Sequence, residues 1–171
     1  MDKLQHFSLP ISGLKNEIHE YTFEIDDDFF AEFDQNLVKK GKFVANVDVD
    51  KRSNHIILHT KIKGFVETNC DRCLADIHLP VVAESTLHVK PGNPDESDDE
   101  VMFIKEEDTS LNLAGLLYEN ILVSVPLIKI YDCESENIRP CNDEVLKYLT
   151  ETGEQKEDGG DTINIFKDIK L

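Results

Sequence analysis

The 171-residue sequence has no long apolar stretch. No run approaches the roughly 18 apolar residues that a membrane-spanning helix needs. The first residues, Met1 to His6, also lack the basic region and apolar core of a secretory signal. We therefore expect a cytoplasmic protein that makes no contact with a membrane.

Motifs of the common enzyme classes are absent as well. The sequence contains no glycine-rich phosphate loop, no His-Glu-x-x-His pair and no Gly-x-Ser-x-Gly turn. It also lacks a ladder of aromatic residues of the kind that stacks nucleic-acid bases. Since no nucleophile, base and oxyanion site can be assembled from it, the sequence predicts a protein that is not an enzyme, with no catalytic residue and no small-molecule substrate.

Positive charge is scarce and unevenly distributed. The chain has 18 Lys and Arg against 35 Asp and Glu, a net charge of -17, which argues against a protein that coats nucleic acid with its whole surface. Residues 39–63, however, carry seven basic and two acidic side chains, a balance of +5 that leaves -22 for the rest of the chain. The sequence therefore encodes a basic island in an acidic protein.

The basic island coincides with a predicted β-hairpin. Apolar and polar residues alternate in residues 43–50 and again in residues 55–63, with Lys51-Arg52-Ser53-Asn54 between them. A register with Asp50 opposite His55 would bring the apolar residues of both strands to one face. On the other face it would place Lys42 opposite Lys63 and would add Lys61 and His59. We interpret these four residues as a candidate nucleic-acid-binding face; the alternative is an ordinary solvated face of a sheet.

The remaining patterns predict one α+β domain over residues 1–150. Period-two alternation recurs in residues 77–89 and 101–104, and helical spacing follows Asp26, begins again near Asp108, and begins once more after Asn142. We expect a mostly antiparallel sheet, curved or barrel-like, with two or three helices. Residues 151–171 are predicted to form an acidic linker and a short amphipathic C-terminal tail.

The four cysteines include one compact pair, Cys70-Asp71-Arg72-Cys73, between two predicted strands. Two thiolates at this spacing can reach one tetrahedral zinc ion, but a closed structural site needs two further ligands. Cys133 and Cys141 are the candidates, although seven residues separate them where two to four are usual. The sequence thus permits one zinc ion per chain held by all four cysteines, or simple reduced structural cysteines. A thiol-redox pair is disfavoured because a strand, not a helix, is predicted after Cys73.

Three separated segments carry a family resemblance. They are the Cys-x-Arg-Cys knuckle at residues 70–73, the acidic segment and helix that end in an Ile-Leu-x-x-x-Pro run at residues 107–126, and the apolar and basic tail at residues 165–171. In this order they resemble the YceD-like family of large-ribosomal-RNA-subunit accumulation proteins. Many members carry further Cys-x-x-Cys pairs after the proline run, where this chain has only Cys133 and Cys141.

The resemblance implies a non-enzymatic accessory role in large ribosomal subunit biogenesis, supporting the accumulation or processing of large-subunit rRNA. The implied partners are a large-subunit ribosomal protein, the large-subunit rRNA precursor, or both. Given the charge distribution, we expect the acidic loops to contact a basic ribosomal protein, with Lys42, Lys61 and Lys63 assisting on rRNA. The alternative is a zinc-binding structural module or a thiol-redox protein that uses Cys70 and Cys73.

Overall fold

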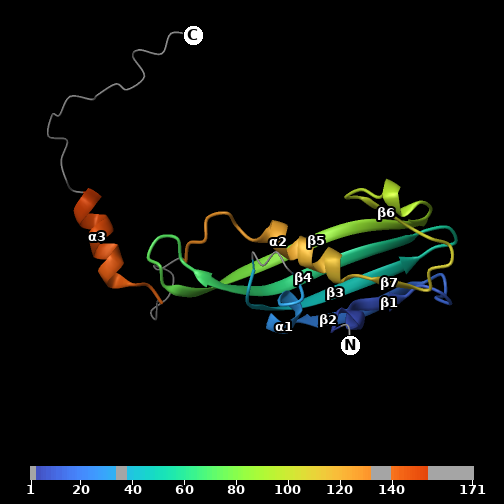
Figure 1. The fold of residues 1–171 in the computed structure, drawn as a ribbon, viewed down its shortest axis with the longest axis horizontal. Helices are drawn as coiled ribbons and strands as arrows, with labels where there is room; N and C mark the ends of the chain where they lie inside the picture. Colours follow the sequence, from blue (N-terminus) through green and yellow to red (C-terminus); the bar gives the residue numbers. More distant parts are fainter. Residues whose placement is uncertain (1–2, 34–37, 132–139, 154–171) are drawn as a thin grey trace, which may run out of the picture.

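The computed structural model describes residues 3–33, 38–131 and 140–153. It contains a five-stranded sheet of order β2-β3-β4-β5-β6 and a two-stranded sheet of β1 and β7 (Figure 1). The elements in chain order are η1 (Lys3–Phe7), β1 (Ser8–Pro10), β2 (Ile18–Ile25), α1 (Asp27–Phe30), β3 (Gly41–Lys51), β4 (Ile56–Asn69), β5 (Asp76–Pro91), η2 (Pro94–Glu96), β6 (Val101–Ile104), β7 (Ser110–Asn112), α2 (Ala114–Ser124) and α3 (Asp143–Gly153).

The predicted α+β class is confirmed, with a curved sheet that is mostly antiparallel. Pairs β2–β3, β3–β4 and β4–β5 are antiparallel, whereas β6 runs parallel to β5. The sheet stays open and does not close into a barrel. In the described part of the chain, no helix has both the length and the apolar character needed to cross a membrane.

The core lies on one face of the large sheet. Burial alternates strictly along β3, from Phe43 to Val49, because successive side chains of a strand point to opposite faces. The inner side chains of β4 and β5 continue this apolar surface, and α2 covers it next to β5 (Figure 1). From α2 and the residue before it, the buried side chains Leu113, Leu117 and Ile121 complete the core. The opposite, outer face of the sheet carries the polar residues.

The β3–β4 hairpin forms as predicted, but the predicted register was wrong: the observed pairing is shifted by two residues. Lys51 pairs with Ile56, not Asp50 with His55, and Arg52 N–H closes the turn by donating to the His55 carbonyl at 2.9 Å. A shift of two residues keeps every side chain on its predicted face. It does change the neighbours: Lys42 lies opposite Phe65, and Lys63 lies opposite Val44. The two lysines are therefore diagonal to each other, which lowers their repulsion.

The helices differ from the predictions mainly in where they begin. Asp26 caps α1 as expected, accepting from the backbone of the first turn, but α1 is a single turn. The helix predicted near Asp108 begins only at Ala114, because residues 110–112 pair with β1 to form β7. Asn142 caps α3 as predicted, with Oδ1 accepting from the N–H groups of Glu144 at 3.1 Å and Val145 at 3.4 Å. The linker and tail beyond residue 153 lie outside the described residues.

Candidate functional site

The turn between β4 and β5 forms a tight knuckle that holds both cysteines of the Cys-x-x-Cys pair. Cys70 N–H donates to the Ala75 carbonyl, and Leu74 N–H donates to the Cys70 carbonyl, each at 2.8 Å. At its base, Asn69 Nδ2 donates to Asp76 Oδ1 at 2.7 Å. Cys70 and Cys73 are free thiols and both are fully buried, so the turn directs the two sulfur atoms inward.

Leu74, directly after the pair, adopts an unusual backbone conformation. Its φ of 59° lies in the left-handed region, which residues other than glycine rarely occupy. Its side chain is nevertheless 65% exposed, so burial of the leucine does not compensate for this conformation. Such strain persists where the surrounding structure demands it and is concentrated at functional sites. Here it serves to close the knuckle around the two sulfur atoms.

The chain after α2 is bound to the knuckle by a reciprocal pair of hydrogen bonds. Asp71 N–H donates to the Lys129 carbonyl, and Lys129 N–H donates to Asp71 Oδ2, each at 2.7 Å. These residues are 58 positions apart in the sequence. The contact therefore places residues 129–131, which precede Cys133 in the sequence, next to Cys70 and Cys73.

The Cys70 sulfur is surrounded by hydrogen-bond donors. Burial of the thiol opposes its ionisation, but N–H groups of Tyr131, Cys73 and Arg72, together with the Cys73 thiol, outweigh burial and lower the pKa of Cys70 below its usual value. Backbone N–H donors of this kind stabilise a thiolate, and hydrogen bonds to a metal ligand also fix its orientation. These hydrogen bonds therefore favour the charged form of the Cys70 sulfur, which burial alone would disfavour.

The other two predicted ligands are placed less clearly. Cys133 lies outside the described residues. Cys141 is half-buried just before α3 and is disulfide-bonded, so a thiolate becomes available there only after reduction. Within residues 3–33, 38–131 and 140–153, no three His, Cys, Asp or Glu side chains converge on one point. The structure thus brings Cys70 and Cys73 together, and it leaves the complete set of four a prediction.

The predicted basic residues Lys42, Lys61, Lys63 and His59 all lie on the outer face of the sheet, which is a mixed surface. Lys61 forms an ion pair with Glu84 of β5, and both side chains are exposed. Glu84 keeps a lowered pKa because of its hydrogen bond to Lys61. The hydroxyl of Thr86 lies 3.1 Å from His59 Nδ1. The neighbouring strands therefore add polar and acidic groups that the hairpin sequence alone does not reveal.

Two further features of the protein surface are not evident in the sequence patterns. On the outer face, the ring of Phe65 stacks on His78 of β5 with 4.6 Å between ring centroids. On the other side of the molecule, a groove runs between α2 and β6, with Met102 and Leu116 among its lining residues. Alternation could have indicated that Phe65 faces outward. The groove depends on the parallel pairing of β6, which no local pattern predicts.

Comparisons with curated proteins and with solved structures each gave no match. One family model, described as "Large ribosomal RNA subunit accumulation protein YceD", matches residues 58–170. The matched segment contains most of β4, the knuckle, β5 and α2. Because this match covers more than half of the chain, the protein belongs to the family of YceD large ribosomal RNA subunit accumulation proteins.

Proposed function

We propose that this protein is a non-enzymatic accessory factor that supports the accumulation or processing of large-subunit rRNA, through contact with a large-subunit ribosomal protein, rRNA or both. The family membership carries this proposal, because the match covers most of β4, the knuckle, β5 and α2. The fold supports it: an open sheet with a polar outer face and an acidic loop before β6 offers two surfaces for macromolecular contact.

Depletion of the protein from its host tests this function directly. We expect the ratio of large-subunit to small-subunit rRNA to fall and unprocessed large-subunit precursor to accumulate, as measured by electrophoresis of total RNA. Expression of the wild-type chain should restore the ratio. A normal ratio and normal ribosome profiles in fully depleted cells would disprove the proposed function.

The outer face is proposed to assist by contacting rRNA. Replacing Lys42, Lys61 and Lys63 together by Glu is expected to weaken binding to a large-subunit rRNA fragment by about tenfold, because each lysine that contacts a phosphate releases counterions on binding. Filter binding at two salt concentrations would measure both the affinity and the reduced salt dependence.

A matched control for this triple variant is Lys15→Glu, Lys105→Glu and Lys147→Glu, which makes the same change in net charge at exposed positions elsewhere. It should bind almost as well as the wild type. Equal binding by both triple variants would show that the outer face makes no specific RNA contact. The proposed role in accumulation of large-subunit rRNA would then depend on protein contacts made by the acidic surfaces.

We further propose that the knuckle is half of a structural zinc site. Cys70 and Cys73 fit the role because both are free and buried, and because N–H donors surround the Cys70 sulfur. Cys133 and, after reduction, Cys141 would provide the other two thiolates. Zinc bound in this way supplies no chemistry to a substrate; it would join the knuckle to the segment that contains Lys129.

A thiol-redox role is the alternative that the lowered pKa of Cys70 favours. Burial opposes it, because neither Cys70 nor Cys73 exposes its side chain to a reagent or a partner disulfide. We therefore expect iodoacetamide at neutral pH to alkylate Cys70 of the folded protein more slowly than it alkylates the free thiol of glutathione. Mass spectrometry measures both rates. Alkylation that is clearly faster than that of glutathione would favour the redox alternative.

A further inference from the structure

A groove of about 560 Å³ separates α2 from β6 and from the loop before β6. Its base includes the buried side chain of Leu87 on β5. Met102 of β6 forms one wall, and Leu116 and Val123 of α2 form the other. Met102 and Leu116 are half-buried, whereas Val123 is 82% exposed. The groove therefore offers a strip of apolar surface that the chain itself leaves uncovered.

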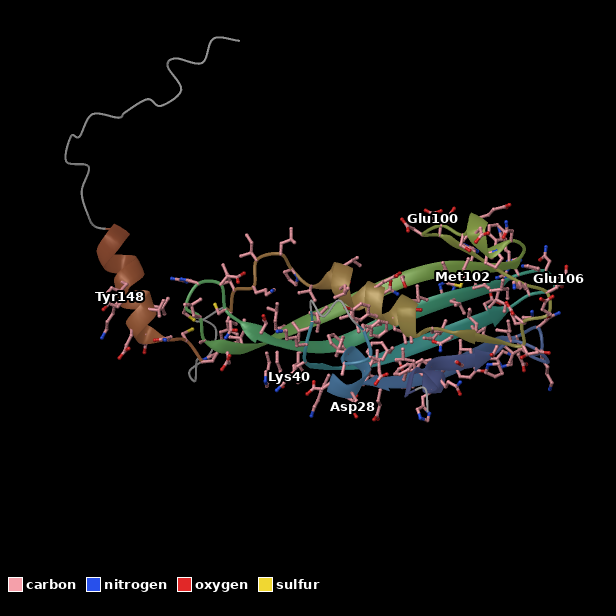
Figure 2. All side chains as sticks on the ribbon, in the orientation of Figure 1. Asp28, Lys40, Glu100, Met102, Glu106 and Tyr148 are labelled. Atoms are coloured by element: carbon pink, nitrogen blue, oxygen red, sulfur yellow. The ribbon has the colours of Figure 1, made fainter. Side chains whose placement is uncertain are left out.

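Acidic side chains border this strip from both walls. Asp98 and Asp99 lie on the loop before β6, and Glu119 lies on α2 between Leu116 and Val123. Among the described residues that line the groove there is no lysine, arginine or histidine. Figure 2 shows Glu100 at the outer side of the same loop, with Met102 closer to the sheet. The charged residues that line the groove are therefore all acidic.

The carboxylate of Asp98 is held in its charged form. Its Oδ1 accepts from the N–H groups of Glu100 at 2.9 Å and Val101 at 2.6 Å, and these bonds, with a smaller contribution from the charge of Lys90, lower the pKa of Asp98. The charge that Asp98 contributes therefore persists at any pH near neutrality.

Both walls of the groove are anchored before any partner arrives. On the loop, Asp98 N–H donates to the Val101 carbonyl at 2.8 Å, and Phe103 N–H donates to Ser97 Oγ at 2.9 Å. On α2, Asn120 Nδ2 donates to Ser85 Oγ of β5 at 2.7 Å. A partner would therefore bind a preformed surface and would spend little free energy on ordering it.

We propose that this groove binds a basic amphipathic segment of a partner protein. Apolar side chains of the segment would lie on Met102, Leu116 and Val123, and its lysines or arginines would face Asp98, Asp99 and Glu119, in the manner of a helix bound in a groove. The charge of -22 outside the basic island would attract such a segment at long range. The inference rests on the proposed function, in which the partner is a basic protein of the large subunit.

A synthetic peptide tests the groove. The probe is a fluorescein-labelled 14-residue peptide that contains only leucine and lysine, with the leucines at helical spacing. One control is an all-lysine peptide of equal charge. The other control is a leucine–glutamate peptide with the same spacing of leucines. By fluorescence anisotropy, we expect the leucine–lysine peptide to bind at least about tenfold more tightly than the all-lysine peptide. The glutamate peptide should not bind.

A matched pair of double variants locates the binding. Glu119→Lys/Val123→Gln should weaken binding of the leucine–lysine peptide by about tenfold or more. The control Glu17→Lys/Leu127→Gln makes the same charge change and also replaces an exposed aliphatic side chain, away from the groove and the outer face, and should change binding less than about twofold. Circular dichroism confirms that both variants fold. The groove inference would be overturned if both double variants lost the same peptide affinity, or if the leucine–lysine peptide bound no more tightly than the all-lysine peptide. Binding would then reflect only general attraction between opposite charges.

The two double variants also separate this inference from the function on which it rests. In depleted cells, the groove variant should fail to restore large-subunit rRNA where the control variant succeeds. If the groove variant binds the peptide like the wild type, the groove inference is wrong even when depletion lowers the rRNA. If depletion has no effect on rRNA, the proposed function is wrong, and the peptide measurements still decide whether the groove binds basic segments.

Discussion

Protein purified under reducing conditions is expected to contain one zinc ion per chain, and removal of that ion is expected to lower the melting temperature by at least about 10 °C. Elemental analysis measures the zinc, and thermal unfolding with and without a chelator measures the shift. The effect should be large because a structural zinc site contributes its binding free energy, about 10–16 kcal/mol in small zinc modules, to the folded state.

The structure gives a reason for this dependence on metal. The pKa of Cys70 is lowered in spite of burial by hydrogen bonds, and a thiolate buried in the knuckle would need a positive charge to compensate its own. A zinc ion would supply that compensation for Cys70 and Cys73 together. It would also hold the knuckle against the segment that donates from Lys129 and Tyr131.

The control for the metal experiment is the Cys70→Ser/Cys73→Ser variant, which should contain no zinc and should show no further shift with chelator. If this variant does not fold, the wild type alone still decides the question, because added Zn²⁺ and not Mg²⁺ should reverse the effect of the chelator. Folded, fully reduced wild-type protein without metal would contradict the proposal and leave the cysteines as buried thiols.

The Gly64→Ala variant is expected to unfold at a clearly lower denaturant concentration, with a loss of roughly 3 kcal/mol or more in the free energy of unfolding. Gly64 of β4 lies opposite Phe43 of β3. A Cβ atom at Gly64 would overlap the carbonyl oxygen of Lys42 and would lie 2.7 Å from the Cα of Phe43. Because these are backbone atoms of the paired strand, relief requires movement of β3 itself and not of a side-chain end.

Gly115→Ala is the matched control, since a Cβ at Gly115 in the first turn of α2 would meet no atom within 4 Å. We expect this variant to be as stable as the wild type or more stable, by about 0.5–1 kcal/mol, because alanine loses less backbone freedom in a helix. Urea denaturation followed by circular dichroism measures both variants. A wild-type midpoint for Gly64→Ala would show that β3 and β4 separate at that position without cost.

Local patterns were sufficient for much of the fold. The alternation in β3, β4 and β5 predicted which side chains are buried, and the caps Asp26 and Asn142 predicted the starts of two helices. The pattern failed near Asp108, where helical spacing and a strand compete over a few residues. Pairing with β1 decided the outcome there, because it satisfies backbone groups of residues 110–112 that a helix would otherwise use.

Of the candidate site, the sequence predicted the knuckle but not its surroundings. Cys70 and Cys73 are close because only two residues separate them, and any turn between β4 and β5 would bring them together. The paired hydrogen bonds of Asp71 with Lys129 join residues that are 58 positions apart, and the donation from Tyr131 to the Cys70 sulfur joins the same two segments. No period or motif in either segment indicates such a contact.

The sequence by itself determined the faces of the strands, the Cys-x-x-Cys turn, the charge imbalance and the family. Only the tertiary structure decided the hairpin register, the mixed character of the outer face and the acidic groove beside α2. The physical reason is that side-chain alternation is unchanged when a strand slides by two residues. Which residues then become neighbours depends on turn closure at Arg52 and on pairing partners distant in the chain, such as β7 beside β1.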